Sequence, residues 1–170
     1  VPSWDQPIIV QPEVGLLGII TKKIDGILYL LLQAKAEPGN IDTFQLAPTV
    51  QATRSNFQRV HGGKKVRYLE YFLSDEKRIS VLVDQLQSEQ GARFYKKRNR
   101  NIVIRVDGDQ LTSVGNNYRW VTIRQLFLLM QHSNVVNMDT RSVIASIDYG
   151  AISRKNIVDI DKEAIQRCLE

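Results

Sequence analysis

The alternation of apolar and polar positions predicts β-strands throughout the first half of the chain. The runs 15–22 and 27–34 are apolar and rich in β-branched residues, and Asp25-Gly26 between them favours a tight hairpin turn. Two further strands are expected over 44–53 and 66–73, where β-branched and aromatic residues recur. The first half is therefore expected to form a sheet that begins with a hairpin.

The spacing of apolar residues changes to a helical period after position 73. Ser74 is a suitable N-cap, and the apolar positions that follow predict an amphipathic helix over 74–90. A strand is expected over 101–106, and Thr122 and Asp139 are expected to cap two more helices. This mixed order predicts an α+β domain with a mixed or largely antiparallel sheet and helices packed on it.

Composition narrows the classes of protein. With 170 residues and 43% hydrophobic content, the chain can bury one core, so residues 1–170 are expected to form a single domain. Cys168 is the one cysteine, and neither a secretory leader nor a membrane-spanning run is recognisable. A cytoplasmic location without a membrane partner is expected. Dinucleotide, P-loop and zinc-protease motifs are absent, which predicts no cofactor and no metal.

Two neighbouring segments are polar where a structural strand would carry an apolar face. Alternate positions of each segment carry hydrogen-bonding groups: Gln33, Lys35 and Glu37 in the first, and Gln45, Thr49, Gln51, Thr53 and Ser55 in the second. Such a face suits a polar ligand better than a hydrophobic core.

Basic residues are concentrated between Lys96 and Arg100, directly after Phe94 and Tyr95, in a chain of net charge +5. This cluster could bind nucleic acid through phosphate contacts and stacking, or the diphosphate of one small nucleotide, or it could be a solvated surface. The run is short and isolated, which favours the small anion and predicts no nucleic-acid partner.

These segments together resemble the NDP-hexose 2,3-dehydratase family. The motifs run in family order from residue 4 to about 147: Trp4–Ile8, Gln33–Asn40, Gln45–Asn56, Arg59–His61, Tyr68–Phe72, Gln87–Gly91, Lys97–Asn101 and Val136–Arg141. Ala36 and Ala47 depart from the family pattern but leave the polar alternation intact. Family members carry two related copies in one chain, and this chain resembles one copy, closest to the first.

The resemblance implies dehydration across C2 and C3 of a dTDP-linked 4-keto-6-deoxyhexose, with a labile 3,4-diketo product passed to a downstream ketoreductase. It also implies a fold similar to the Nudix superfamily. The cluster of carboxylates used by metal-dependent Nudix hydrolases is missing, because the segment ending at Gly91 offers only Glu89, so pyrophosphate hydrolysis is disfavoured. A single copy leaves open a nucleotide-sugar-binding or dimerisation module without catalysis, and a homodimer is expected to replace the usual tandem.

The reaction needs a base, an acid and a group that stabilises the C4 oxygen. The candidates for these roles are Glu37, His61, Glu89, Lys35 and Asp139. Asp139 could instead cap a helix, His61 could order its glycine-rich loop, and Glu89 could pair with Lys97 or Arg98. The candidates for substrate binding are Trp4, Gln33, Gln45, Thr49, Gln51, Thr53, Arg54, Ser55, Asn56, Arg59, Tyr95, Arg98 and Arg100.

Overall fold

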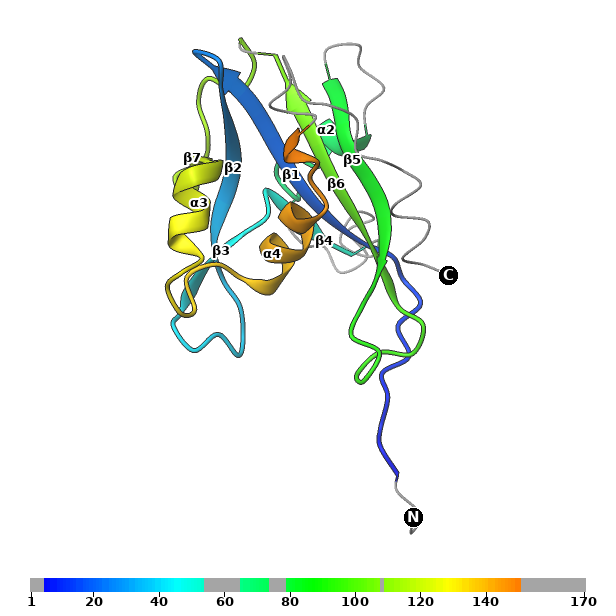
Figure 1. Cartoon of the computed structure of the whole chain (residues 1–170). Coiled ribbons are helices and arrows are strands. Elements are labelled where there is room, and N and C mark those ends of the chain that lie inside the picture. Colours follow the sequence, from blue (N-terminus) through cyan, green and yellow to red (C-terminus); the bar gives the residue numbers. More distant parts are fainter. Residues whose placement is uncertain (1–4, 54–64, 74–78, 108, 151–170) are drawn as a thin grey trace.

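A computed structural model describes residues 5–53, 65–73, 79–107 and 109–150. The strands are β1 (Gly15–Ile24), β2 (Ile27–Ala36), β3 (Phe44–Ala47), β4 (Val50–Ala52), β5 (Ile79–Ser88), β6 (Arg98–Val106) and β7 (Tyr118–Thr122). The helices are α2 (Glu70–Leu73), α3 (Ile123–Leu129) and α4 (Met138–Ala145). Figure 1 shows these elements as one twisted sheet with helices on its faces.

The sheet has the strand order β3-β2-β1-β6-β5, with β4 added to β1 and β7 added to β2. The β1–β6 pair is parallel, whereas every other pair of named strands is antiparallel. The mixed sheet with packed helices confirms the predicted α+β class. The predicted hairpin is also confirmed, since Ile24 pairs with Ile27 across a turn in which Asp25 and Gly26 have φ angles of 50° and 78°.

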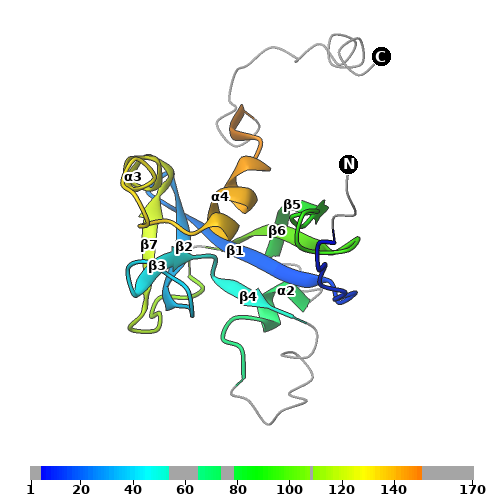
Figure 2. The same ribbon diagram turned by 90° about the horizontal axis from the view of Figure 1, so that it is seen from below.

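Each face of the sheet carries its own hydrophobic cluster. One cluster contains Leu16, Ile20 and Phe72 and lies on the side of α2, and the other contains Leu17, Ile19 and Val143 and lies on the side of α4. Figure 2 shows α3 and α4 on one face and α2 on the other. Because successive residues of β1 serve opposite clusters, the whole strand is buried from Gly15 to Lys22.

The predicted helix over 74–90 is wrong, because its described part, 79–88, is the edge strand β5. This strand pairs antiparallel with β6 and has a β-bulge between Val81 and Val83. Leu82 and Val83 both pack on the α4 side as a result. Two adjacent apolar residues on one face reproduced the spacing of a helix, which is why the sequence pattern was misleading.

The expected strand over 66–73 is also wrong. Its described residues form a turn and the short helix α2, and Tyr68 has a φ of 64°. The Tyr68 ring lies edge-on against Tyr118 with centroids 4.9 Å apart, and its hydroxyl accepts a hydrogen bond from the Gly115 N–H at 3.0 Å. These tertiary contacts outweigh the β propensity of the aromatic residues. The expected strand over 44–53 is interrupted between β3 and β4.

One of the two predicted helix caps is confirmed. Thr122 caps α3, and its hydroxyl and the Gln125 side chain form a reciprocal capping box. Asp139 is not the cap of α4, because the Asn137 side chain accepts the hydrogen bond from the Thr140 N–H. Asp139 therefore lies in the first turn of α4, with its carboxyl group available for other contacts. No helix of the described segments is long and apolar enough to span a membrane.

Candidate active site

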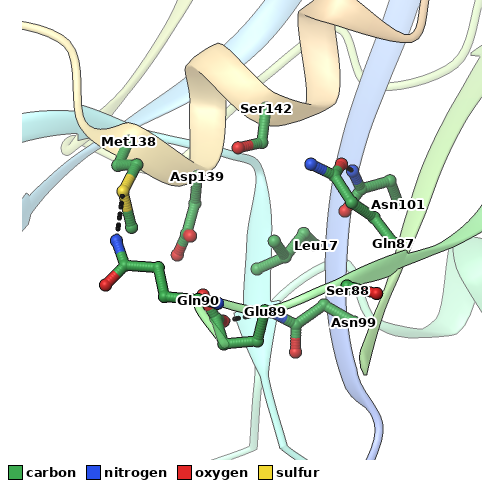
Figure 3. Close-up of a pocket in the computed structure, with 10 residues that line it drawn as sticks. All are labelled: Leu17, Gln87, Ser88, Glu89, Gln90, Asn99, Asn101, Met138, Asp139 and Ser142. Atoms are coloured by element: carbon green, nitrogen blue, oxygen red, sulfur yellow. Dashed lines mark hydrogen bonds between the residues drawn. The ribbon is translucent and has the colours of Figure 1, made fainter. Parts of the chain in front are cut away.

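A pocket of about 180 Å³ lies between the first turn of α4 and the strand ends of β5 and β6. Figure 3 shows Asp139 pointing from α4 toward Leu17 and Glu89 on the floor of this pocket. Most of the other lining groups are amides or hydroxyls: Gln87, Ser88, Gln90, Asn99, Asn101 and Ser142. The pocket is therefore polar, although it is built beside the hydrophobic cluster under α4.

The sheet register sets these polar side chains side by side. Leu17 of β1 pairs with Gln51 of β4 on one side and with Asn101 of β6 on the other. Gln85 of β5 is the next partner of Asn101. Residues paired across neighbouring strands lie on the same face, so distant segments contribute to one polar row. Leu17 is the apolar member of that row.

Two amide side chains organise the end of the row at β5 and β6. Asn99 Nδ2 donates to Glu89 Oε2 at 2.6 Å, and Asn101 Nδ2 donates to Gln87 Oε1. The buried oxygens Gln51 Oε1 and Asn101 Oδ1 have no hydrogen-bond partner among the described residues. Buried polar atoms are nearly always paired, so these two acceptors suit the hydroxyl groups of a ligand.

Glu37 is held at the neighbouring edge of the site. Its Oε1 accepts hydrogen bonds from Lys35 Nζ and from Gln51 Nε2, each at 3.0 Å. Because Gln51 belongs to the polar row, Glu37 and Lys35 are connected to the pocket floor through one side chain.

Asp139 has the electrostatic environment of a proton donor or acceptor. Its pKa is raised from 3.8 to about 6, first by burial and then by the negative charges of Glu89 and Glu37, while Lys35 opposes the rise. Acid–base catalysis works best when the pKa lies near the operating pH. The three carboxylates proposed from sequence thus act on one another in the folded chain.

Hydrogen-bond donors surround the carboxylates of this site. Among the described residues, no group of three or more histidine, cysteine, aspartate or glutamate side chains is arranged to hold a metal ion. Asn99 and Gln51 instead donate hydrogen bonds to two of the carboxylates. These two carboxylates, Glu89 and Glu37, therefore accept hydrogen bonds from side-chain N–H groups.

The structure brings together four of the five proposed catalytic residues, Lys35, Glu37, Glu89 and Asp139, together with Gln51. Gln33 and Gln45 lie next to Lys35 on β2 and its partner β3. Thr53 follows β4 directly. The remaining proposed residues of this region lie outside the described residues: Trp4, Arg54, Ser55, Asn56, Arg59 and His61.

Other proposed binding residues are placed away from this pocket. Thr49 is 1% exposed, and its hydroxyl accepts from the Ile20 N–H and donates to the Leu31 carbonyl, so it joins strands of the core. Arg100 makes two hydrogen bonds with the Asp84 carboxylate, at 2.6 and 2.7 Å. It lies between Asn99 and Asn101 in β6 and therefore points to the opposite face. Tyr95 is exposed, with Lys96 Nζ 5.2 Å from its ring centroid.

Sequence reasoning missed the amide residues of the pocket, notably Gln87, Asn99 and Asn101. A signal was present, because Asn99 and Asn101 alternate with Arg98 and Arg100, leaving no apolar position at the start of the strand. This segment was interpreted as a basic cluster, because its arginine residues drew attention away from the two asparagine residues between them.

The substitution Gly15→Ala tests whether the Asn99–Glu89 hydrogen bond contributes to turnover. A Cβ added at Gly15 would lie 2.7 Å from Asn99 Oδ1, so Gly15→Ala must displace that side chain. We expect turnover to fall by about tenfold, the value of one charge-assisted hydrogen bond, with a small change in unfolding free energy. Steady-state kinetics and urea denaturation measure the two effects.

Gly18→Ala is the matched control on the same strand. Its Cβ would lie 2.6 Å from the Phe72 ring on the opposite face of the sheet. Overpacking against this buried ring should lower the unfolding free energy by about 1–3 kcal/mol while leaving Asn99 in place. Equal turnover in Gly15→Ala and the unsubstituted chain would argue against a role for the Asn99–Glu89 contact.

The fold and site thus define an α+β domain with a polar pocket that contains two carboxyl groups. The family model for NDP-hexose 2,3-dehydratase matches residues 1–147, so the chain belongs to this family. It is 52% identical over 148 residues to a dTDP-4-dehydro-6-deoxy-alpha-D-glucopyranose 2,3-dehydratase from Saccharopolyspora spinosa, covering 87% of this chain and 30% of the relative.

A second relative with the same name, from Streptomyces violaceoruber, is 50% identical over 146 residues, covering 86% of this chain and 32% of the relative. The chain therefore spans about a third of the length of these curated relatives.

Solved structures with similar folds include Nudix hydrolases. One from M. smegmatis has a TM-score of 0.45 and 15% identity and covers 79% of this chain and 87% of its own. An ADP compounds hydrolase has a TM-score of 0.44 and 12% identity, covering 79% of this chain and 71% of its own.

Proposed function

We propose that this chain catalyses the loss of water across C2 and C3 of a dTDP-linked 4-keto-6-deoxyhexose. The relatives named above carry this activity in their names. The observation that carries the proposal for this chain is the facing of Asp139 and Glu89 across a pocket of amides, with the pKa of Asp139 raised to about 6. Such a pair can remove one proton and supply another.

The roles follow from the hydrogen bonds of each carboxylate. Glu89 accepts hydrogen bonds from Asn99 Nδ2 at 2.6 Å and from the Gln90 N–H at 3.1 Å, which hold its carboxyl group at the wall of the pocket. We assign Glu89 as the base that removes the C3 proton, which is acidic because it lies α to the C4 ketone. The electrons move to the C4 oxygen and form an enolate.

Asp139 then serves as the acid. Burial and the neighbouring carboxylates favour its protonated form, so it can protonate the C2 hydroxyl. The enolate electrons return, the C2–O bond breaks, and water leaves. Lys35, held by Glu37 at 3.0 Å, is the proposed positive charge for the C4 oxygen. The mechanism is balanced without an external oxidant or reductant.

The alternative function is a nucleotide-sugar-binding or dimerisation module without catalysis of its own. A homodimer and a ketoreductase that receives the labile product are further partner proposals. Sedimentation velocity of the purified chain measures the first of these.

Incubation of the purified chain with dTDP-4-keto-6-deoxyglucose in deuterated water tests the two functions. The dehydratase proposal expects loss of one water, with deuterium at C3 of the remaining substrate and at C2 of the diketo product, detected by mass spectrometry and NMR. Saturable binding of the nucleotide sugar without water loss or exchange would reject catalysis by this copy and support the binding module.

A further inference from the structure

A second, basic pocket adjoins the pocket that contains Glu89 and Asp139, which is called the acidic pocket below. It has a volume of about 430 Å³, and its lining includes Phe94, Lys96 and Lys97 from the connection between β5 and β6, and Arg98 at the start of β6. Ser88 and Glu89 line both pockets and form the border between them. A ligand can therefore extend from the carboxylates into the basic pocket without crossing the sheet.

Lys97 is the most constrained charge of the basic pocket. It is only 8% exposed, its Nζ donates to Gln11 Oε1 at 2.7 Å, and its Nζ lies 5.4 Å from the Phe94 ring centroid. In the segments that the structure describes, no carboxylate forms an ion pair with it. An ammonium group has three donors, and a buried one is normally paired with a negative charge. The Lys97 ammonium thus has donors and charge left for an anion.

The backbone around these cations is fixed. Residue 9 forms a parallel bridge with Phe94, in which the Ile9 N–H donates to the Arg93 carbonyl at 2.8 Å and the Tyr95 N–H donates to the Ile9 carbonyl at 3.0 Å. Lys96 has a φ of 51°, which is uncommon for a residue with a Cβ. The connection therefore presents its basic residues on a held backbone rather than on a freely moving tip.

The chemistry of the substrate decides which basic pocket is relevant. The carbon that carries the diphosphate is C1, which is bonded to C2, the carbon that loses its hydroxyl. The diphosphate must therefore bind next to the pocket in which the elimination occurs. The basic pocket satisfies this condition because it shares Glu89 with the acidic one.

Two other sets of basic residues within the described segments fail this condition. Lys65 and Arg67 line a third pocket, which has no lining residue in common with the acidic pocket and lies beside α2 on the other face of the sheet. Arg100 lines neither of the two adjoining pockets, and both oxygens of Asp84 bind its guanidinium group. These cations therefore do not adjoin the pocket that contains Glu89.

We infer that the pocket of Lys96, Lys97 and Arg98 binds the diphosphate of the nucleotide sugar. This inference rests on the proposed function and adds to it: Lys97 supplies a buried, pre-positioned charge, and Lys96 and Arg98 supply exposed ones. The substrate then lies across Glu89, with its sugar beside Asp139 and its diphosphate beside Lys97. Lys97 is thus the buried member of the basic cluster for which the sequence favoured a small anion.

Calorimetric titration of the purified chain with dTDP tests the inference, with inorganic pyrophosphate as a competing probe. The variants are Lys97→Gln, Lys96→Gln and Arg98→Gln, and Lys65→Gln in the third pocket is the matched control. Each of the first three should weaken dTDP binding by about tenfold, the value of one charge-assisted hydrogen bond, and Lys65→Gln should not. If Lys97→Gln does not fold, the exposed Lys96 and Arg98 still provide the test.

Unchanged dTDP affinity in Lys96→Gln and Arg98→Gln, or an equal loss in Lys65→Gln, would overturn the inference. Absence of dTDP binding by the unsubstituted chain would overturn it as well. The proposed function is tested by a different result. If the chain binds dTDP through these residues but releases no water, the diphosphate site is supported and the dehydratase activity is rejected. Conversely, if the chain releases water and all variants bind dTDP with unchanged affinity, the dehydratase activity is supported and the diphosphate site is rejected.

Discussion

Asp139→Asn should abolish water loss but leave deuterium exchange at C3. Asparagine keeps the shape of the side chain but cannot donate an acidic proton to the C2 hydroxyl, while Glu89 can still form the enolate reversibly. The loss of turnover should reach about 10²–10⁴-fold, the usual contribution of a positioned acid. NMR measures exchange at C3, and mass spectrometry of the same sample measures water loss.

The pH dependence gives this prediction a second readout. If Asp139 is the acid, kcat/KM of the unsubstituted chain should fall as pH rises through about 6, where its carboxyl loses the proton. A rate that falls instead as pH decreases through this value would assign Asp139 as a base. Glu70→Gln, a carboxylate-to-amide change in α2 on the opposite face, is the control and should keep both the rate and its pH profile.

Asp139→Asn should also stabilise the fold at neutral pH. The pKa of Asp139 in the folded chain, about 6, lies above its ordinary value of 3.8, so folding favours the protonated form. The contribution of the protonated Asp139 carboxyl to the free energy of unfolding is complete below about pH 3.8 and is lost as the pH rises through about 6. After allowance for solvent screening of this partly exposed group, Asp139→Asn should gain about 1 kcal/mol at neutral pH and above. Urea denaturation across this pH range measures the difference.

Glu89→Gln should abolish both water loss and C3 exchange. Without the carboxylate no base removes the C3 proton, so the enolate never forms, and the reduction should again reach about 10²–10⁴-fold. This complete loss distinguishes a base from an acid, because Asp139→Asn should retain exchange. A Glu89→Gln variant that still exchanges the C3 proton would transfer the role of base to Glu37.

Glu89→Gln should also lower the pKa of Asp139, since the Glu89 charge is one of the groups that raise it. NMR titration of the Asp139 carboxyl carbon in the two chains measures this shift without any turnover. An unchanged pKa would mean that Glu89 does not interact with Asp139 and that burial and the other neighbouring charges set the value.

The hairpin shows what local sequence can predict. Asp25-Gly26 and the apolar runs beside it specify β1 and β2 through turn geometry and alternation, which need no distant partner. The segment 79–88 shows the limit of the same reasoning. Its bulge arises from pairing with β6, so no local pattern distinguishes it from a helix.

The candidate site divides in a similar way. Lys35 and Glu37 were predicted together because they alternate on one strand, and their ion pair is local. Asp139 was proposed as a catalytic candidate with a helix cap as the alternative, and its actual environment depends on Glu89 and Glu37, which are distant in sequence. Asn101 was missed because its significance comes from the register that sets it beside Leu17 and Gln51.

By itself, the sequence determined the α+β class, the first hairpin, the family, and the polar residue types required for acid–base chemistry. These features depend on composition, short-range spacing and matching motifs. The tertiary structure alone decided which carboxylates share a pocket, which basic residues adjoin it, and which, such as Arg100, are bound elsewhere. The physical reason is that strand pairing and side-chain alternation assign each residue to a face, and electrostatic interactions depend on distance through space rather than along the chain.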